Sequence, residues 1–226
     1  MEEILREKYL SSPRFKRYLL ATGNQEDKAK KLYVANLRLA QAFHPIVSQF
    51  EVVLRNALNK VLTNYFSDPD WIINQRTGFM NNPTLASSDY FLRESIFRTV
   101  RQLRRQNIPI TTDKIISNQM FGFWLAFFLP HHYTLVEGRS IAVFGNKPLS
   151  ENRASLYSRL KLIRDFRNRM NHCEPLCFQG YTTDCTTAQI IHAQLYDLIR
   201  WINPDLIPYF ESIDKVPLAI DLLTKI

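Results

Sequence analysis

An apolar repeat of helical period, running from Glu26 to about Tyr65, constrains the fold of this chain more than any other feature. Apolar residues recur every three or four positions at Leu32, Ala35, Leu39 and Phe43, and again at Phe50, Val53, Leu54, Ala57, Leu58 and Val61. This spacing places them along one side of an α-helix. Pro45 separates the two stripes, so the sequence predicts either two consecutive helices or one kinked helix.

Helix signals also recur through the rest of the chain. We expect helices over Glu2–Leu10, from Ser12 to Gly23, over Tyr90–Gln106 with a cap at Ser88-Asp89, from Thr112, over Met120–Leu129, over Glu151–Cys173 and over Ala188–Ile202. Residues 67–88 and 173–187 indicate loops, the first with a short helix near Trp71. No segment alternates like a strand, and no internal repeat occurs.

These patterns predict an all-α protein, folded as one domain over residues 1–226 in an up-and-down bundle with additional helices. The core of that domain is expected over residues 26–203, and residues 204–226 are expected to form short helices.

The formal net charge of +8 points to a polyanionic partner, nucleic acid first. The chain lacks a secretory signal at its start and has no apolar run long enough for a membrane span. Three cysteines in a chain of this length are typical of a reducing compartment. We therefore expect a cytoplasmic protein without a membrane partner.

The segment Leu160–Pro175, LKLIRDFRNRMNHCEP, combines an apolar helix face with an unusual set of polar groups. On a helical wheel the apolar arc consists of Leu162, Ile163, Phe166 and Met170. A separate arc, roughly 140° wide at this helical period, consists of Arg164, Arg167, Asn168, Asn171 and His172. Pro175 ends the helix just after the histidine.

Three of these residues suit RNA cleavage without a metal. The imidazole of His172 can accept a proton from a ribose 2′-OH or donate one to the leaving 5′-oxygen. The guanidinium of Arg167 can hold the phosphate and stabilise the charge that develops on it. Asn168, one turn before the histidine, can orient either partner. The products would be a 2′,3′-cyclic phosphate and a 5′-hydroxyl, and DNA would resist cleavage.

The stretch RDFRNRMNHCEP resembles the signature of the Abi-like (abortive infection) family of the HEPN superfamily of nucleases, in which such a helix end carries the catalytic Arg and His. FEVVLRNALNKVL resembles the family's upstream helix with its E-x-x-x-R-N pattern, here Glu51, Arg55 and Asn56. FGFWLAFF resembles its central Gly-Phe-Trp segment. Family members often carry a second His where this chain has Cys173.

The resemblance implies a HEPN-like helical bundle with metal-independent endoribonuclease activity, no cofactor, and a homodimer that builds a composite active site. It also implies a role in phage defence or as the toxin of a toxin–antitoxin module, held in check by an antitoxin RNA or protein. By resemblance, Arg167 and His172 are catalytic with Asn168 in support, and Glu51, Arg55 and Asn56 orient them or bind RNA. Arg164 and Asn171 join this supporting set. The alternatives are a non-catalytic HEPN module that binds RNA or regulates a partner, and a purely structural helical bundle.

Other clusters leave two interpretations open. Arg98, Arg101 and Arg105 can contact RNA phosphates, or they can form a solvated face. Glu51 and Arg55 can form an ordinary exposed pair. Cys173, Cys177, Cys185 and His172 have some zinc-ligand character, but they lack paired C-x-x-C spacing, and we expect no metal. His131-His132 is expected at a surface or a dimer interface.

Overall fold

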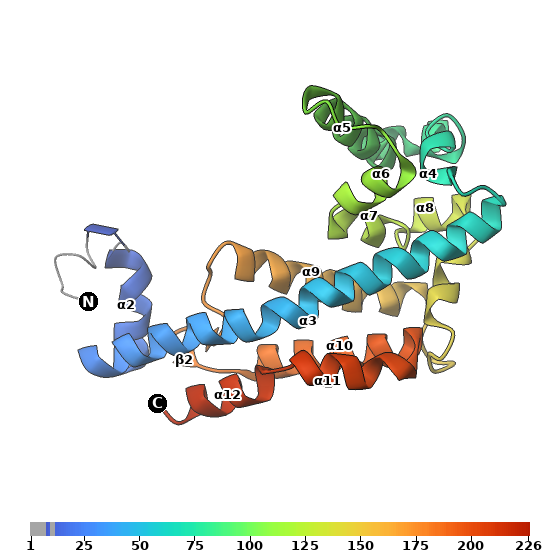
Figure 1. The fold of residues 1–226 in the computed structure, drawn as a ribbon. Coiled ribbons are helices and arrows are strands. Elements are labelled where there is room, and N and C mark those ends of the chain that lie inside the picture. Colours follow the sequence, from blue (N-terminus) through green and yellow to red (C-terminus); the bar gives the residue numbers. More distant parts are fainter. Residues whose placement is uncertain (1–7, 10–11) are drawn as a thin grey trace. The chain divides into compact units, whose positions relative to one another are not determined.

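The computed structural model describes residues 8–9 and 12–226, and it confirms the predicted all-α class (Figure 1). The longer helices are α2 (Ser12–Ala21), α3 (Glu26–Phe66), α5 (Phe91–Arg105), α9 (Arg153–Asn171), α10 (Thr186–Ile202) and α12 (Val216–Thr224). The shorter helices are α4 (Trp71–Asn74), α6 (Thr112–Asn118), α7 (Phe121–Ala126), α8 (Pro130–Leu135) and α11 (Ile207–Ile213). The 3₁₀ segments are η1 (Phe79–Asn81), η2 (Pro83–Ser88), η3 (Arg139–Phe144) and η4 (Pro204–Leu206). The helix expected over Glu2–Leu10 lies outside the described residues, except that Lys8 and Tyr9 are helical.

Helix α3 continues through Pro45 as a single element of 41 residues (Figure 1). The proline removes one backbone donor. Its neighbours Phe43 and Ile46 are fully buried, so packing on both sides of Pro45 maintains the helix. Of the two structures that the sequence allowed, the chain therefore adopts one long helix and not two consecutive helices.

The chain divides into two compact units, and each is built from separate stretches of sequence. Unit 1 consists of the residues up to Ser48, Asp165–Tyr196 and Ile207–Ile226. Unit 2 consists of Gln49–Arg164 and Asp197–Leu206. Helices α3, α9 and α10 contribute residues to both units, and the expectation of a single domain stays a prediction.

The core of unit 1 is formed by aromatic contacts between elements that are distant in sequence. The rings of Phe43 on α3 and Phe166 on α9 meet edge to face with centroids 4.6 Å apart. Tyr18 on α2 packs in the same way against Phe178, with centroids 5.1 Å apart. Offset and edge-to-face pairs of this kind add stability beyond the area they bury.

The core of unit 2 gathers around α3 and the aromatic segment of α7. Phe50 and Phe121 have ring centroids 6.3 Å apart, and Trp71 and Phe127 have centroids 5.9 Å apart. The indole N–H of Trp71 donates to Asn59 Oδ1 at 2.8 Å, so the amide on α3 satisfies a buried donor. Asn59 therefore has a structural role.

The structure corrects two local expectations. The predicted helix over Met120–Leu129 is helical only as α7, because the chain turns after Ala126 and Pro130 begins α8. The predicted cap at Ser88-Asp89 is wrong, since α5 begins at Phe91 without a side-chain cap. The Asp89 N–H instead bonds the Ala86 carbonyl and closes η2.

The region expected as a loop after α9 contains a small antiparallel hairpin. Strands β1 (Phe178–Gln179) and β2 (Thr182–Thr183) pair with Phe178 opposite Thr183. Gly180 takes a left-handed φ of 61° in the connecting turn, which glycine adopts at little cost. Arg17 on α2 donates to the Gly180 carbonyl at 2.6 Å and fixes this turn to the helix.

None of the helices among the described residues has the length and apolar character that a membrane span requires.

Candidate functional site

The end of α9 has a defined stop that fixes the backbone around His172. The Glu174 N–H bonds the Arg169 carbonyl at 2.9 Å, and the Cys173 N–H bonds the Met170 carbonyl at 3.0 Å. Cys173 takes the left-handed φ of 54°. This is the Schellman arrangement, usually built on glycine. The His172 N–H still bonds the Asn168 carbonyl at 3.0 Å, so the histidine remains part of the last helical turn.

Arg169 attaches the following loop to α9. Its Nη2 donates to the Pro175 carbonyl at 2.5 Å, and its Nε lies 3.4 Å from Glu174 Oε2. The next residue, Leu176, donates its N–H to Oδ1 of Asn36 on α3 at 2.7 Å, inside the buried core of unit 1. The helix end is therefore held both by its own arginine and by a buried amide of α3.

The predicted polar arc of α9 is largely accessible. Asn168, Asn171 and His172 are exposed, and Arg167 is half-buried. Of the predicted apolar arc, Ile163, Phe166 and Met170 are buried. Leu162 is 39% exposed, so its assignment to the buried face was wrong. It lies at the edge of the apolar arc, where solvent reaches the helix.

Arg167, Asn168 and Asn171 lie on the last turn and a half of α9, and His172 follows directly; all four belong to unit 1. Arg164, one turn earlier, belongs to unit 2.

Glu51, Arg55 and Asn56 lie on the part of α3 that belongs to unit 2. Asn56 is exposed, and Arg55 Nη1 donates to the Ser117 carbonyl at 3.3 Å. The expectation that these residues face Arg167 and His172 therefore stays a prediction.

The basic helix α5 presents the predicted arginines to solvent. Arg98, Arg101 and Arg105 are exposed, and their spacing of three and four residues places them on one face of α5. None of them forms an ion pair within the described part of the chain. Arg93 differs, because its guanidinium pairs with Glu94 at 3.1 Å and bonds Asn81.

The three cysteines are free thiols and do not form a shared ligand set. Cys173 is exposed, whereas Cys177 and Cys185 are buried. Burial, with a smaller contribution from Cys185, raises the pKa of the Cys177 thiol to about 12. Across residues 8–9 and 12–226 no group of three or more His, Cys, Asp or Glu side chains is arranged to hold a metal ion. This observation counts against the zinc interpretation of these cysteines.

Two histidine clusters differ from the sequence-based expectations. His132, expected at a surface or dimer interface, is fully buried in unit 2 with its ring centroid 4.3 Å from that of His131. In unit 1, His192 Nε2 lies 2.5 Å from Asp214 Oδ2, which also accepts from the Tyr196 hydroxyl at 3.0 Å. The sequence showed the His131-His132 pair but not its burial, and it gave no signal for the His192–Asp214 contact, which joins residues 22 positions apart.

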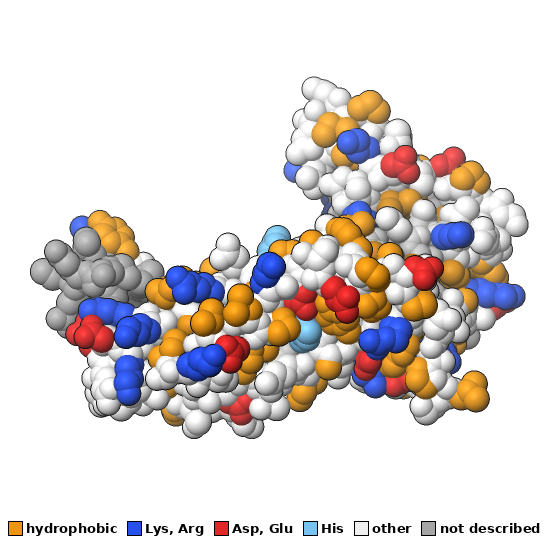
Figure 2. All heavy atoms as spheres, turned by 60° about the horizontal axis from the view of Figure 1, so that its bottom comes forward, with side chains coloured by type: hydrophobic (Ala, Val, Ile, Leu, Met, Phe, Trp, Pro, Cys, Tyr) orange, Lys and Arg blue, Asp and Glu red, His pale blue; other side chains and the backbone are white. Residues whose placement is uncertain are grey.

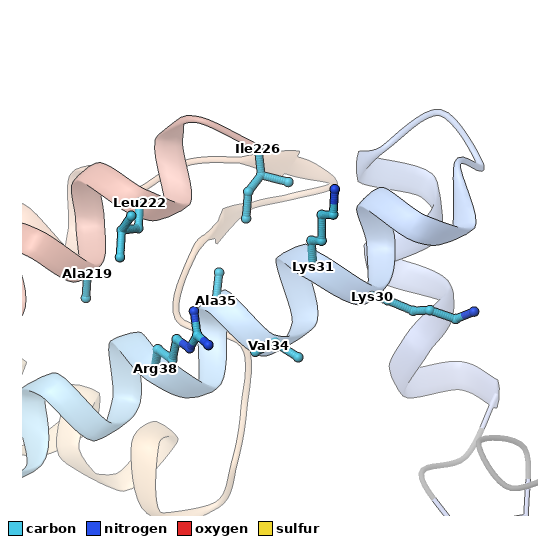
Figure 3. A pocket seen from close by; sticks show the side chains of 8 residues that line it. All are labelled: Lys30, Lys31, Val34, Ala35, Arg38, Ala219, Leu222 and Ile226. Carbon is cyan, nitrogen blue, oxygen red and sulfur yellow. The ribbon is translucent and has the colours of Figure 1, made fainter. Parts of the chain in front are cut away.

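Unit 1 also carries two neighbouring depressions between α3 and α12, of about 420 and 350 Å³, which share Arg38, Ala219 and Leu222. Figure 3 shows Lys31 and Arg38 extending from α3 toward α12 beside apolar side chains of that helix. Among the described residues, no Asp or Glu side chain lines either depression. Hydrophobic and basic side chains are similarly mixed on the face drawn in Figure 2. The charged side chains in the two linings are all basic: Lys30, Lys31, Arg38 and Lys215.

No protein-family model matches the chain, and no curated protein or solved structure matches it either. The resemblance to the Abi-like family therefore rests on the motifs in the sequence.

Proposed function

We propose that this chain is a metal-independent endoribonuclease of the Abi-like HEPN type, with Arg167 and His172 as its catalytic pair. One observation carries the proposal: exposed His172, exposed Asn168 and half-buried Arg167 lie within the last turn and a half of helical backbone, which a specific helix stop fixes. Rigid placement of a proton-transfer group and a cation is what phosphodiester chemistry requires of a protein.

The reaction needs two proton transfers. The ribose 2′-oxygen attacks the adjacent phosphorus and loses its proton to a base, and the P–O5′ bond breaks while the 5′-oxygen gains a proton from an acid. A neutral His172 serves as the base, and a protonated His172 serves as the acid. Arg167 stabilises the charge on the phosphate oxygens, and Asn168 orients the phosphate or the ring. A homodimer supplies two imidazoles, one for each transfer.

The biological setting follows from the same resemblance. We propose a cytoplasmic protein that acts in phage defence or as a toxin, with RNA as substrate and an antitoxin RNA or protein as its restraint. Its net charge of +8 and the exposed arginines of α5 support an RNA substrate. The same two features suit the competing hypothesis, a HEPN module that binds RNA or regulates a partner without cleaving it.

Cleavage of labelled RNA in the presence of EDTA tests the enzyme against the binding module. We expect wild type to release fragments with 2′,3′-cyclic phosphate and 5′-hydroxyl ends. His172→Ala and Arg167→Ala should each lower the rate by at least about a hundredfold, the scale of lost general acid–base or electrostatic catalysis. His44→Ala is the matched control, because His44 is also exposed but lies on α3.

Activity that survives both substitutions contradicts the proposed mechanism. The absence of cleavage by wild type, together with tight RNA binding, supports the binding module instead. Toxicity on expression that either substitution relieves is a second indication of the enzyme. The proposed homodimer is checked by sedimentation velocity, which should give twice the chain mass of 26.6 kDa.

A further inference from the structure

Unit 2 contains a cavity of about 320 Å³ whose lining includes neither Arg167 nor His172. Its walls come from five helical elements, η2, α5, α7, α8 and α9. Phe91 and Tyr157 supply aromatic surface, and Leu125 and Leu129 supply aliphatic surface. The volume is near the lower end of the roughly 300–1,000 Å³ typical of ligand pockets. It therefore suits a small, mostly apolar group.

The polar part of the lining contains an acceptor without a donor. His132 is fully buried, and its Nδ1 lies 3.1 Å from the Ala126 carbonyl oxygen. Because a carbonyl can only accept, Nδ1 must carry the proton. Burial, together with the neighbouring His131, lowers the pKa of His132 to about 4, so the ring is neutral near pH 7. Its Nε2 then carries no proton, and its lone pair can accept a hydrogen bond.

That lone pair has no hydrogen-bond partner among the residues that the structure describes, and neither has the buried Nε2 of His131. A buried acceptor left unpaired is destabilising, because the hydrogen bond to water that it loses on burial is not replaced. Such an atom in the wall of a cavity indicates a ligand that brings an N–H or O–H group. Aromatic walls and a buried acceptor together fit a flat ring with donors on its edge.

The charged side chains on the surrounding helices indicate which class of ligand carries such a ring. Arg164 lines the cavity and lies on α9, the helix that also carries Arg167 and His172. Phe91 opens α5, whose exposed face carries Arg98, Arg101 and Arg105. Two of the helices that line the cavity carry cationic side chains, which attract phosphate groups. A ring that is linked to phosphates therefore fits this site.

We propose that this cavity binds one unpaired nucleobase of an RNA strand, whose edge donates a hydrogen bond to Nε2 of His132. The base must be unpaired, because a Watson–Crick partner would occupy the donors on its edge. Proteins commonly bind single-stranded RNA by holding bases against aromatic side chains and reading their edges. The proposal depends on the proposed function for RNA as the ligand, and it adds a site that selects single-stranded RNA.

Two substitutions change the cavity in different ways. Gly122 lines it, and a Cβ placed on Gly122 meets no atom within 4 Å, so Gly122→Leu should fill the cavity without a clash. His132→Phe keeps an aromatic ring and removes the acceptor. Gly145→Leu is the matched control, because Gly145 is exposed, has a helical φ of −61° and lies outside the lining. Circular dichroism and thermal melting confirm that each variant is folded.

Fluorescence anisotropy with RNA that cannot be cleaved measures binding separately from catalysis. The probes are labelled 2′-O-methyl strands of A, C or U, each about ten nucleotides long, a typical single-strand site size, and a duplex of the A and U strands. We expect wild type to bind at least one single strand about tenfold more tightly than the duplex. Gly122→Leu and His132→Phe should each weaken that binding about tenfold, a loss of about 1.4 kcal/mol. Gly145→Leu should bind as wild type does.

Three results would overturn the proposal. The first is that both cavity variants bind every single strand as wild type does, and the second is that the duplex binds as tightly as the best single strand. The third is that free AMP, CMP or UMP, at a concentration equal to that of the strand, displaces the strand. That result would mean that the cavity binds a mononucleotide. Loss of RNA cleavage in His172→Ala would stand under any of these results, so the two proposals fail separately.

Discussion

Arg169 and Glu174 are joined twice across the end of α9, once by the backbone bond from the Glu174 N–H to the Arg169 carbonyl and once by their side chains, with 3.4 Å between Nε and Oε2. In many Schellman stops an apolar contact connects the equivalent positions. Here an ion pair takes that place. The second arginine of the R-N-R motif is thereby engaged in holding the loop, and the proposed phosphate contact is assigned to the first, Arg167.

Arg169→Ala should lower the free energy of unfolding by about 1–2 kcal/mol, because it removes a charge-assisted bond to the Pro175 carbonyl together with the ion pair. Arg200→Ala is the matched control, since the exposed Arg200 is also in the last turn of its helix but only pairs with half-buried Asp197 at 3.4 Å. That control should cost about 0–0.5 kcal/mol. Urea unfolding measures both values, and equal losses would show that the clamp has no special role.

Cys173→Gly should stabilise the protein by about 1 kcal/mol, because Cys173 occupies a left-handed conformation that costs a residue with a side chain roughly 1–2 kcal/mol. The cleavage rate should stay unchanged, since the proposed chemistry uses His172 and not its neighbour. Asn24→Gly, at a φ of 60°, is the control and should gain less, because asparagine tolerates this region. A destabilised Cys173→Gly protein would mean that the thiol contributes packing that outweighs the backbone gain.

The arginines of α5 should set the salt dependence of RNA binding. Each phosphate contact to a single strand contributes about 0.7 to the slope of log K against log salt, so replacing Arg98, Arg101 and Arg105 together by Gln should reduce its magnitude by about 2. Arg93→Gln should leave the slope unchanged, since Glu94 and Asn81 already hold that guanidinium. An unchanged slope in the triple variant would identify these arginines as a solvated face.

Burial of neutral His132 should make stability depend on pH. Its pKa is lowered from 6.5 to about 4 in the folded chain, so below pH 6.5 the unfolded state binds a proton that the folded state does not. The contribution of neutral His132 to the free energy of unfolding is fully present above pH 6.5. It falls as the pH drops and is lost by about pH 4. The expected loss is about 3 kcal/mol.

The difference in unfolding free energy between wild type and His132→Phe, measured by urea unfolding at several pH values, isolates this contribution. The unfolding free energy of wild type minus that of His132→Phe should be constant above pH 6.5 and should decrease as the pH falls below it. A difference that does not vary between pH 7 and pH 4 would show that His132 titrates normally.

Local pattern was sufficient to predict most of the helices. The stripes at Leu32–Phe43 and Phe50–Val61 identified α3, and Pro175 correctly indicated where α9 stops. Pro45 was harder to interpret, because a proline breaks a helix only where its surroundings do not compensate. Phe43 and Ile46, buried beside it, belong to a core that no local window contains.

The polar arc of α9 was equally visible in the sequence, since helical spacing alone places Arg167, Asn168 and His172 near one another. The role of Arg169 was not visible, because its partners Glu174 and Pro175 meet it only after the chain reverses at Cys173. The unpaired acceptor Nε2 of His132 could not be predicted from the sequence either. It follows from a hydrogen bond to a carbonyl six residues away and from burial by several helices.

Residue spacing was enough to predict the all-α class, the position of most helices and the set of polar groups at the end of α9, because each of these depends on spacing within one helix. Three features required the folded chain: the continuity of α3 through Pro45, the exposure of Leu162 and the burial of His132 beside a cavity. These outcomes depend on which side chains from distant segments share a core. That is set by the simultaneous burial of apolar surface across the fold, which no single stretch of the sequence specifies.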